Sequence, residues 1–498
     1  MTVSRGGCSV LRSRVLLVAT WGSPWRNPCR EDPNSEENFS WHRVVYVYSD
    51  EEKGAVRRTE SRTSLKLLYD VYRPDEVHII VCDTVACARD GDRYSVLVKR
   101  IEERYRQFIE KELGGDLAKK CWVHVVPCFG AFSNGVFLSS PLDTYATVLY
   151  ELYRAVKRAA ENAGSVKLVV DLTHGINYMP AILYRAAERI ARIASFGTSV
   201  ELIVVNSDPY APSRDTGVRE LRINTVEHAN ILKSLDLHYA AKLRGSTNPV
   251  YRPSSAEYSK EVGRANREFR ECSLGNLLNL YSAVYLGAPL AVHTYMLSEP
   301  EFENVRRCVD RYFEKFRSDE NVVVERSDGG LRVWRKLSVD EQMIFALESL
   351  VLAESLRAAG VKSSREVELK TLEETAEKIA WSRSLHYVMK NEVSSIKMLI
   401  CRYLVKKLTG VDDRKIVEKC VEVLKELSEW RTLRDIAKEL GMSPGEFQYR
   451  NFIAHSGLEY NVTKVKLGLV LSYEEKMLKD IENCLKSLYG KPPKSSQG

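Results

Sequence analysis

One short stretch near the end of the chain carries side chains suited to chemistry on a phosphate. In "YRNFIAHSG", residues 449–457, Arg450 and His455 stand five positions apart, and Asn451 follows the arginine. A guanidinium can hold two phosphate oxygens at once, and an imidazole exchanges a proton near neutral pH. No carboxylate or thiolate lies between them, so the set suits a phosphodiester better than a metal ion.

The surrounding sequence predicts that these side chains lie on one helix. Ser443 can cap its start, Pro444 suits the first turn, and Gly457 can end it. At about 100° per residue, such a helix has one packing side and one polar side. The packing side is expected to hold Tyr449, Phe452 and Ile453, and the polar side Arg450, Asn451, Ala454 and His455.

The composition is that of a globular protein with more than one domain. A chain of 498 residues predicts two or three domains, and its formal net charge of +7 allows an anionic partner without requiring one. No apolar run is long enough for a membrane helix, so a cytoplasmic location is expected. The 11 cysteines include no CxxC and fit neither a disulfide framework nor a zinc site. Cys82 and Cys87 are therefore interpreted as small buried hydrophobic residues.

The first half of the chain has the pattern of a doubly wound α/β domain. Apolar runs that predict buried strands alternate with amphipathic stretches, among them expected helices at 145–162 and 181–195. The expected strands are "RVLLVAT", "VVYVY", "EVHIIVC", "CWVHVVP", "VKLVVDL" and "VELIVV". Most end in small or polar residues, and open α/β sheets bind ligands at the carboxyl ends of their strands.

One of these strand ends, "DLTHGINYMP", is the most informative. Gly175 allows a tight turn and Pro180 suits the start of the next helix, so free backbone amides would face a ligand there, as in phosphate sites. The chain has neither GxGxxG nor GxxxxGK[ST], which argues against a dinucleotide oxidoreductase and a P-loop ATPase.

The second half is predicted to be mainly helical. Residues 235–316 read as helices, 322–334 as a hairpin around an Asp328-Gly329 turn, and the rest as a helical bundle. The expected bundle helices are 338–360, 367–408, 414–430, 432–441, the helix of Arg450, and 464–489. The predicted domains are thus 1–234, a connector with a winged hairpin at 235–336, a bundle at 337–490 and a disordered tail at 491–498.

These motifs resemble, in their order, the CRISPR-associated CARF-HEPN ribonucleases, the Csx family of accessory proteins in type III systems. The likeness is carried by "VATWGSPW", "WHRVVYVY", "CDT", "VVDLTHGINYMP", "VVNSDP" and "YRNFIAHSG". The resemblance implies a Rossmann-like CARF domain that senses cyclic oligoadenylate, expected to be the tetra-adenylate. It also implies a HEPN domain that cleaves single-stranded RNA without metal or cofactor, with RxxxxH motifs meeting across a homodimer.

The resemblance assigns roles to particular residues. Arg450 and His455 would be the catalytic pair, with Asn451 supporting them. The activator pocket would draw on Thr20, Trp21, Gly22, Ser23, Asp83, Thr84, Thr173, His174, Gly175, Asn177, Asn206 and Ser207. Whether His174 or Thr173 also helps to degrade the activator stays open.

Elementary chemistry agrees with this reading. RNA carries its own nucleophile, the 2′-hydroxyl, so an imidazole for proton transfer and a guanidinium for the phosphate suffice. One histidine does not easily serve both proton transfers, whereas a twofold dimer, or a higher oligomer of dimers, supplies two. A ring of adenylates could sit across two CARF domains and bias how their HEPN partners face each other.

Two other functions fit parts of the sequence. "TLRDIAKELGMSPGEFQYRN", residues 432–451, has the form of a helix-turn-helix, and the hairpin could be its wing, which together would indicate a nucleotide-sensing DNA-binding transcription regulator. A sensor without catalytic activity that only scaffolds partners is the other alternative. Glu446, Phe447 and Gln448 make a poor base-reading face, which weighs against the regulator. The set of Arg450, Asn451 and His455 weighs against the sensor without catalytic activity.

Overall fold

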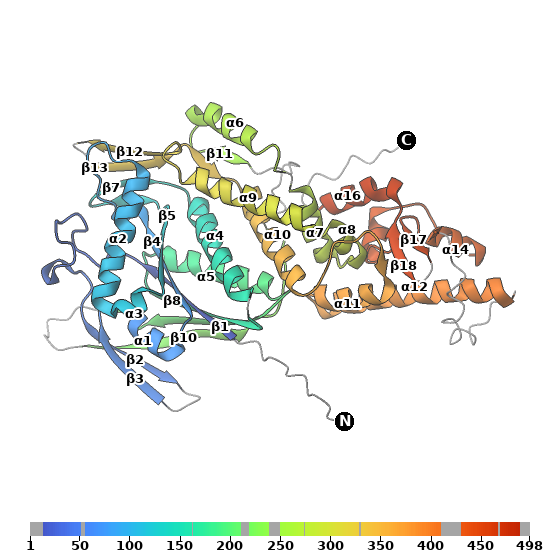
Figure 1. Ribbon diagram of the computed structural model, residues 1–498, viewed down its shortest axis with the longest axis horizontal. Helices are drawn as coiled ribbons and strands as arrows, with labels where there is room; N and C mark the ends of the chain where they lie inside the picture. Colours follow the sequence, from blue (N-terminus) through green and yellow to red (C-terminus); the bar gives the residue numbers. More distant parts are fainter. Residues whose placement is uncertain are drawn as a thin grey trace, which may run out of the picture. The chain divides into compact units, whose positions relative to one another are not determined.

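The computed structural model describes residues 13–50, 55–161, 163–210, 219–238, 250–272, 274–327, 330–409, 430–466 and 469–488. Contacts within the chain divide it into two units (Figure 1). The N-terminal unit comprises residues 1–232, 250–268 and 309–340, and the C-terminal unit comprises 233–249, 269–308 and 341–498. The connector expected at 235–336 is thus shared between the two units, while the domain boundaries named above stay a prediction.

The N-terminal unit is built on an eight-stranded mixed sheet with the order β3-β2-β10-β9-β8-β1-β4-β5. The central strands β9, β8, β1, β4 and β5 are parallel, and β10 runs antiparallel to β9. The strands are β1 (Ser13–Trp21), β2 (Val44–Asp50), β3 (Ala55–Ser61), β4 (Glu76–Cys82), β5 (Cys121–Val126), β8 (Ser165–His174), β9 (Ser199–Ser207) and β10 (Glu220–Asn230). All six strands predicted from apolar runs are present, and β3 and β10 were not predicted.

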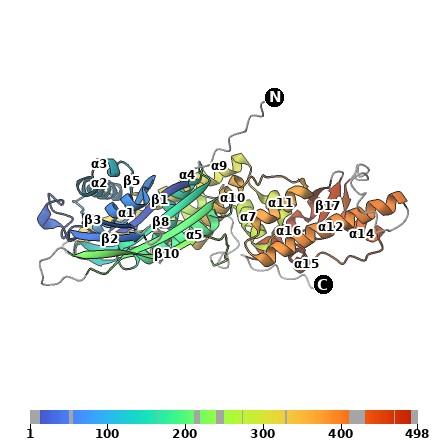
Figure 2. The same ribbon diagram turned by 90° about the horizontal axis from the view of Figure 1, so that it is seen from below.

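Helices cover both faces of this sheet, as the apolar strands require. Leu17, Ala19 and Trp21 of β1 point to the face covered by α1 (Leu65–Tyr72) and α2 (Tyr94–Leu113), where they join one buried core. On the other face α4 (Pro141–Ala160) and α5 (Met179–Ala194) pack against each other and against β1 and β8. The short α3 (Gly115–Ala118) follows α2 (Figure 2). The doubly wound α/β prediction is confirmed.

A second sheet of the N-terminal unit contains the predicted hairpin. Its order is β12-β13-β7-β6, with β6 (Gly130–Phe132), β7 (Gly135–Leu138), β12 (Val322–Ser327) and β13 (Gly330–Arg335). Strands β12 and β13 pair antiparallel, while the expected turn at 328–329 lies outside the described residues. The hairpin is not a free wing, because β13 pairs parallel with β7. A Cβ at Gly135, whose φ is +155°, would collide with the carbonyl of Leu331.

Smaller elements complete the N-terminal unit. Strand β11 (Tyr251–Pro253) pairs with β14 (Leu337–Val339), and α6 (Ser259–Glu268) follows β11. Single 3₁₀ turns occur at Glu36–Asn38, Asp83–Val85 and Ala256–Tyr258. Helix α9 (Glu299–Phe316) contributes residues to both units.

The C-terminal unit is mainly helical, as predicted, with one small sheet. Its helices are α7 (Gly275–Leu286), α8 (Pro289–Tyr295), α10 (Glu341–Ala358), α11 (Leu369–Ile379), α12 (Arg383–Thr409), α14 (Leu433–Glu439), α15 (Tyr449–Ala454) and α16 (Leu478–Lys486), and a 3₁₀ turn spans Glu475–Met477. The sheet has the order β15-β18-β17-β16, formed by β15 (Val367–Glu368), β18 (Val470–Tyr473), β17 (Thr463–Lys466) and β16 (Arg431–Thr432). The fold class inferred from the sequence is thus confirmed.

Two of the helix predictions in this unit need correction, and a third lies almost entirely outside the described residues. The helix expected at 464–489 is wrong for its first part, which forms β17 and β18. The helix expected at 367–408 is broken into α11 and α12 around residues 380–382. The helix expected at 414–430 falls almost entirely outside the described residues.

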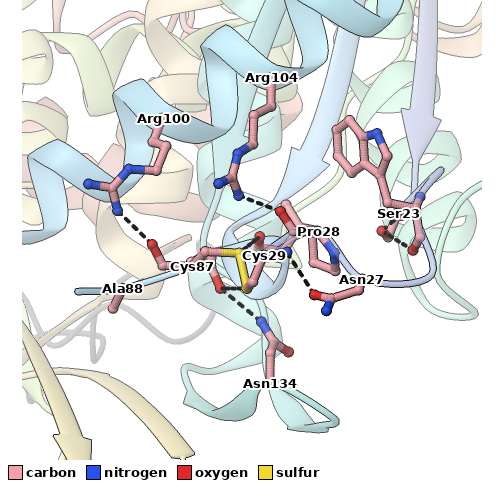
Figure 3. The surroundings of a disulfide bond; sticks show 12 residues. Ser23, Asn27, Pro28, Cys29, Cys87, Ala88, Arg100, Arg104 and Asn134 are labelled. Carbon is pink, nitrogen blue, oxygen red and sulfur yellow. Dashed lines mark hydrogen bonds between the residues drawn. A yellow bond between two sulfur atoms is a disulfide. The ribbon is translucent and has the colours of Figure 1, made fainter. Parts of the chain in front are cut away.

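The interpretation of the cysteines is also wrong. The structure forms the disulfides Cys29–Cys87, Cys82–Cys128 and Cys272–Cys308. Figure 3 shows the first of them, which joins the loop after β1 to the loop after β4. The partners are 36 to 58 positions apart in sequence, so no local motif reveals them. Among the described helices, none is long and apolar enough to cross a membrane.

Candidate functional site

The helix that carries Arg450 and His455 is shorter than predicted. It spans Tyr449–Ala454, begins after Gln448, and has His455 at its C-cap. Ser443 and Pro444 lie before the helix, in a segment without regular structure, so they do not start it. Gly457, at φ +75°, follows the end of the helix as expected. Its left-handed backbone and its close contacts with Ala288 and Tyr473 leave no room for a side chain.

The two sides of this helix differ as predicted, with one exception. Phe452 is buried, whereas Arg450, Ala454 and His455 are exposed. Ile453 was expected to pack and is instead 38% exposed. The polar side of α15 is therefore open to a substrate, and an isoleucine lies beside it.

A carboxylate that sequence reasoning missed orients the histidine. Glu392 lies in α12, and its Oε2 is 2.9 Å from Nδ1 of His455. With Nδ1–H donated to this carboxylate, Nε2 is the ring nitrogen left for proton transfer. Half of the His455 side chain is exposed, and Glu392 is more enclosed, at 24%. The pair thus resembles a general acid or base with an orienting group.

The side chains of Arg450 and Asn451 have no protein partner among the residues that the structure describes. No hydrogen bond or ion pair to the side chain of Arg450 or Asn451 occurs within those ranges. Arg450 is exposed and Asn451 half-buried on the same side of α15 as His455. A guanidinium without a protein carboxylate remains free for a phosphate.

Helix α12, which supplies Glu392, also exposes apolar side chains. Tyr387 is 65% exposed, Met398 49%, and Val388 lies beside Tyr387 with 42%. Asn391, Ser394 and Ser395 are exposed between them. Their spacing by three to four residues puts them on one stripe of the helix. Small and apolar residues on such a stripe are typical of a helix that packs on another helix.

In the N-terminal unit the sequence placed a second site at the carboxyl ends of the strands, and His174 is its most constrained residue. Its ring stacks on Trp41 with centroids 4.3 Å apart, and its Nε2 is 3.1 Å from the hydroxyl of Tyr46. The backbone N–H of Ser64 points to the same nitrogen at 3.4 Å. Burial lowers the pKa of His174 to about 3, so the ring is neutral at physiological pH.

The turn beside His174 is organised by a buried acid that was not predicted. Asp171 accepts hydrogen bonds from the backbone N–H and the hydroxyl of Thr173, at 3.0 and 2.6 Å, and from Ser64 at 2.6 Å. The carbonyl of His174 accepts a hydrogen bond from the N–H of Gly22 at 2.6 Å, which joins the ends of β8 and β1. These contacts bring the Gly22 and Thr173 loops together.

Several residues proposed for the activator pocket are engaged in the core. Trp21 is buried and lies edge-on to Trp41 and Phe108. Asp83 is buried in an ion pair with Arg335 at 2.9 Å and accepts a hydrogen bond from Tyr94. Thr20 and Thr84 are buried as well. These buried side chains stabilise the ends of the strands and are not exposed to a ligand.

The remaining proposed residues, except Gly22, are at least partly accessible to solvent. Asn177 and Asn206 are exposed, and Ser23, Thr173, His174, Gly175 and Ser207 are partly so, whereas Gly22 is buried. All of them lie at or just after the carboxyl ends of β1, β8 and β9, which are adjacent strands of the sheet. Fewer of the predicted pocket residues are accessible than the sequence suggested. Trp41, Tyr46, Ser64 and Asp171 hold the accessible ones in place.

The helix-turn-helix reading fits the structure poorly. Helix α14 ends at Glu439 and α15 begins at Tyr449, with no helix between them. A DNA-reading helix-turn-helix joins its two helices by three or four residues. The segment 440–448 is too long for such a turn, and the expected wing is paired within a sheet of the other unit.

Both parts of the chain match models of one protein family. The model described as "CRISPR system endoribonuclease Csx1, CARF domain" matches residues 16–209, and the model of the HEPN domain of the same family matches residues 382–475. The first covers the sheet with the His174 site, and the second covers α12, α15 and the His455–Glu392 pair. The fold and the matched domains define a CARF-HEPN protein.

The chain belongs to the CARF-HEPN family of CRISPR-associated ribonucleases. A similar protein is the CRISPR system endoribonuclease Csx1 of Methanocaldococcus jannaschii, 25% identical over 471 residues, which are 91% of this chain and 87% of the relative. A solved structure, Enterococcus italicus Csm6 bound to cyclic hexa-2′-fluoro-hexa-dAMP, aligns with 96% of this chain and 100% of its own at 12% identity. Its TM-score of 0.22 means that it says nothing about the geometry of the sites.

Proposed function

We propose that the chain is a metal-independent endoribonuclease that cleaves single-stranded RNA when a cyclic oligoadenylate, the tetra-adenylate, occupies its CARF domain. The observation that carries this proposal is the arrangement on α15. His455 is held by Glu392 through Nδ1 at 2.9 Å, and the cation of Arg450 lies exposed on the same short helix. The setting is type III CRISPR antiviral defence, which the family membership supports.

In the proposed mechanism the chain's own groups handle protons and charge. Nε2 of His455 accepts the proton of the RNA 2′-hydroxyl or donates a proton to the leaving 5′-oxygen. Each such transfer contributes roughly 10² to 10⁴-fold. Arg450 holds the oxygens of the phosphate and neutralises the charge that develops in the transition state. Asn451 supports the phosphate with its amide.

Glu392 acts as a positioning residue in this mechanism. By accepting the Nδ1 proton, it keeps Nε2 pointed away from α12 and selects one tautomer of the imidazole. It also stabilises the imidazolium formed after proton uptake. It does not itself need to touch the RNA.

A homodimer would supply the second histidine that the two proton transfers require. The exposed stripe of α12, with Tyr387, Val388 and Met398, supports such an assembly, because apolar side chains of this size gain by burial against a second copy. Glu392 lies on this helix, so an α12 interface would place two His455–Glu392 pairs near one another.

The activator is proposed to bind at the carboxyl ends of β1, β8 and β9. The neutral ring of His174 suits a nucleobase, and the backbone N–H groups that follow it in the turn suit a phosphate, whereas the N–H of Thr173 is bonded to Asp171. The exposed amide side chains of Asn177 and Asn206 can recognise base edges.

Cleavage of a fluorescent single-stranded RNA in EDTA, with and without cyclic tetra-adenylate, tests the proposal. The expected result is cleavage that requires the activator and persists in EDTA. If RNA is cleaved only after a divalent metal is added, the metal-independent mechanism is wrong. If the activator binds without changing the rate, the coupling between the domains is wrong.

A further inference from the structure

The N-terminal unit contains a cavity that is lined by none of the residues assigned above to the activator, although one of them, Asp83, is bonded to Arg335 of its wall. Its volume is about 570 Å³, within the range of small-molecule sites. It is formed by the end of β7, the start of α4, strands β12 to β14, and the turn between β11 and α6. Figure 1 shows β7, β12 and β13 side by side.

One wall of this cavity is aromatic. The ring of Trp334 is half-buried, and its Nε1–H donates to the hydroxyl of Tyr258 at 2.9 Å, which fixes the orientation of the indole. The exposed guanidinium of Arg332 lies over the indole, 5.1 Å from the ring centroid. The face of the ring thus already accommodates a planar polar group. A nucleobase is also planar and polar and can stack on this face in place of the guanidinium.

Another part of the lining, Arg335, is already bonded to protein partners. Arg335 lines the cavity and is only 2% exposed. Its Nη2 donates to Asp83 at 2.9 Å and to the hydroxyl of Tyr94 at 2.7 Å. Its Nε–H is buried without an acceptor among the described residues. Because this nitrogen is not accessible to a water-sized molecule, Arg335 holds the wall of the cavity in place and offers no donor to a ligand.

The charged side chains that line the cavity distinguish between a ligand with a phosphate and one without. Glu257 and Glu325 line the cavity and are exposed. The third acid, Asp143, already accepts hydrogen bonds from the N–H groups of Ser140 and Val339, at 3.0 and 2.7 Å. The lining has one exposed cation, Arg332, against these acids, so its net charge is negative. The carboxylates accept hydrogen bonds from hydroxyl groups and disfavour a phosphate.

We propose that this cavity binds an unphosphorylated nucleoside. The base stacks on Trp334 in place of the Arg332 guanidinium, and the ribose hydroxyls donate to Glu257 or Glu325. The site is distinct from the pocket proposed for the oligoadenylate, because no residue of that pocket lines it. The inference does not depend on the ribonuclease activity.

Calorimetric titration of the full chain with adenosine, guanosine and uridine, each beside its 5′-monophosphate, tests this proposal. We expect saturable binding of at least one nucleoside at one site per chain, and at least tenfold weaker binding of its monophosphate. Trp334→Ala should abolish the binding. Trp122→Ala is the matched control, because Trp122 is 52% exposed and also carries an arginine, Arg158, 5.4 Å from its ring centroid.

Two further variants keep the test decisive if Trp334→Ala fails to fold. Glu325→Gln, at an exposed position, should raise the affinity for the monophosphate, and Thr173→Ala should leave nucleoside binding unchanged. The proposal is overturned if no nucleoside binds, if the monophosphate binds as tightly, if binding survives in Trp334→Ala, or if single-stranded RNA displaces the nucleoside from the site.

Discussion

Two histidines, one in each unit, lie in opposite environments. His174 is stacked on Trp41, accepts hydrogen bonds at Nε2, and has its pKa lowered to about 3 by burial. His455 is half-exposed, and its Nδ1 faces the carboxylate of Glu392. The first ring is held neutral against an aromatic surface, as suits recognition. The second is open to solvent and backed by an acid, as suits proton transfer.

The different surroundings of His174 and His455 show that the chemistry of a histidine depends on its neighbours as well as on its residue type. Both histidines lie in motifs that carry the family resemblance, "DLTHGINYMP" and "YRNFIAHSG". Only the partners brought from distant parts of the chain distinguish them: Trp41 and Tyr46 for one, and Glu392 for the other. We therefore expect changes at the two sites to have separable effects on activator binding and on RNA cleavage.

The largest effect is expected for His455→Ala, because this variant removes the proposed proton-transfer group. Activator-stimulated cleavage should fall by roughly 10² to 10⁴-fold, while activator affinity stays within twofold of the wild type, roughly the spread of mutational effects at distant sites. His228→Ala is a matched control, since His228 forms a similar exposed pair with Glu201 at 2.8 Å. Equal losses in both variants would show that the effect is not specific to the site.

The next largest effect is expected on removal of the disulfide that anchors the loop packed on His174. The loop between β1 and β2 carries Trp41, and the disulfide Cys29–Cys87 ties this loop to the end of β4 (Figure 3). Cys29→Ser should lower the free energy of unfolding of the N-terminal unit by about 2–4 kcal/mol, because the bridge closes a long loop. It should also weaken activator binding. Cys121→Ser, which removes a free thiol, is the control, measured by thermal unfolding without reductant.

A smaller effect is expected for Glu392. Loss of one charge-assisted hydrogen bond to an exposed imidazole, about 1.5 kcal/mol, corresponds to roughly a tenfold lower kcat in Glu392→Ala. Glu392→Gln keeps an acceptor for Nδ1–H and should fall between this variant and the wild type. Single-turnover rates at several RNA concentrations check it. A change in KM alone would mean that Glu392 binds RNA instead of orienting His455.

The smallest effect, counted per pH unit, is a dependence of stability on pH that comes from His174. Its folded pKa of about 3 lies below the ordinary value of 6.5, so the unfolded chain binds more protons between these values. The N-terminal unit should therefore lose stability as pH falls below about 6.5, by at most about 1.4 kcal/mol per pH unit. His174→Gln should flatten this slope in denaturant titrations between pH 4.5 and 6.5. An unchanged slope would mean that the ring is not desolvated.

The sequence predicted the central strands well because their signal is local. The run "EVHIIVC" coincides with β4, Glu76–Cys82, and "RVLLVAT" lies within β1. The hairpin of β17 and β18 also had a local signal that was overlooked. Thr463 and Val465 are buried while Lys464 and Lys466 are less so, an alternation typical of a strand.

The features that the sequence could not predict depend on contacts between distant segments. Glu392 is 63 residues before His455, and nothing in the spacing of either residue points to the other. The same holds for Asp83, which appeared to be a ligand-binding residue after a strand, yet pairs with Arg335, 252 residues later. Only the folded chain shows that this acid is already paired, and that its partner lines a cavity.

The most direct test of the central claim measures both functions in the same preparation. Wild type and His455→Ala are each titrated with cyclic tetra-adenylate by calorimetry and then assayed for cleavage of single-stranded RNA in EDTA. The account predicts equal activator affinity in both proteins and cleavage only in the wild type. Activator-dependent cleavage by a folded His455→Ala protein would contradict the assignment of chemistry to the second histidine.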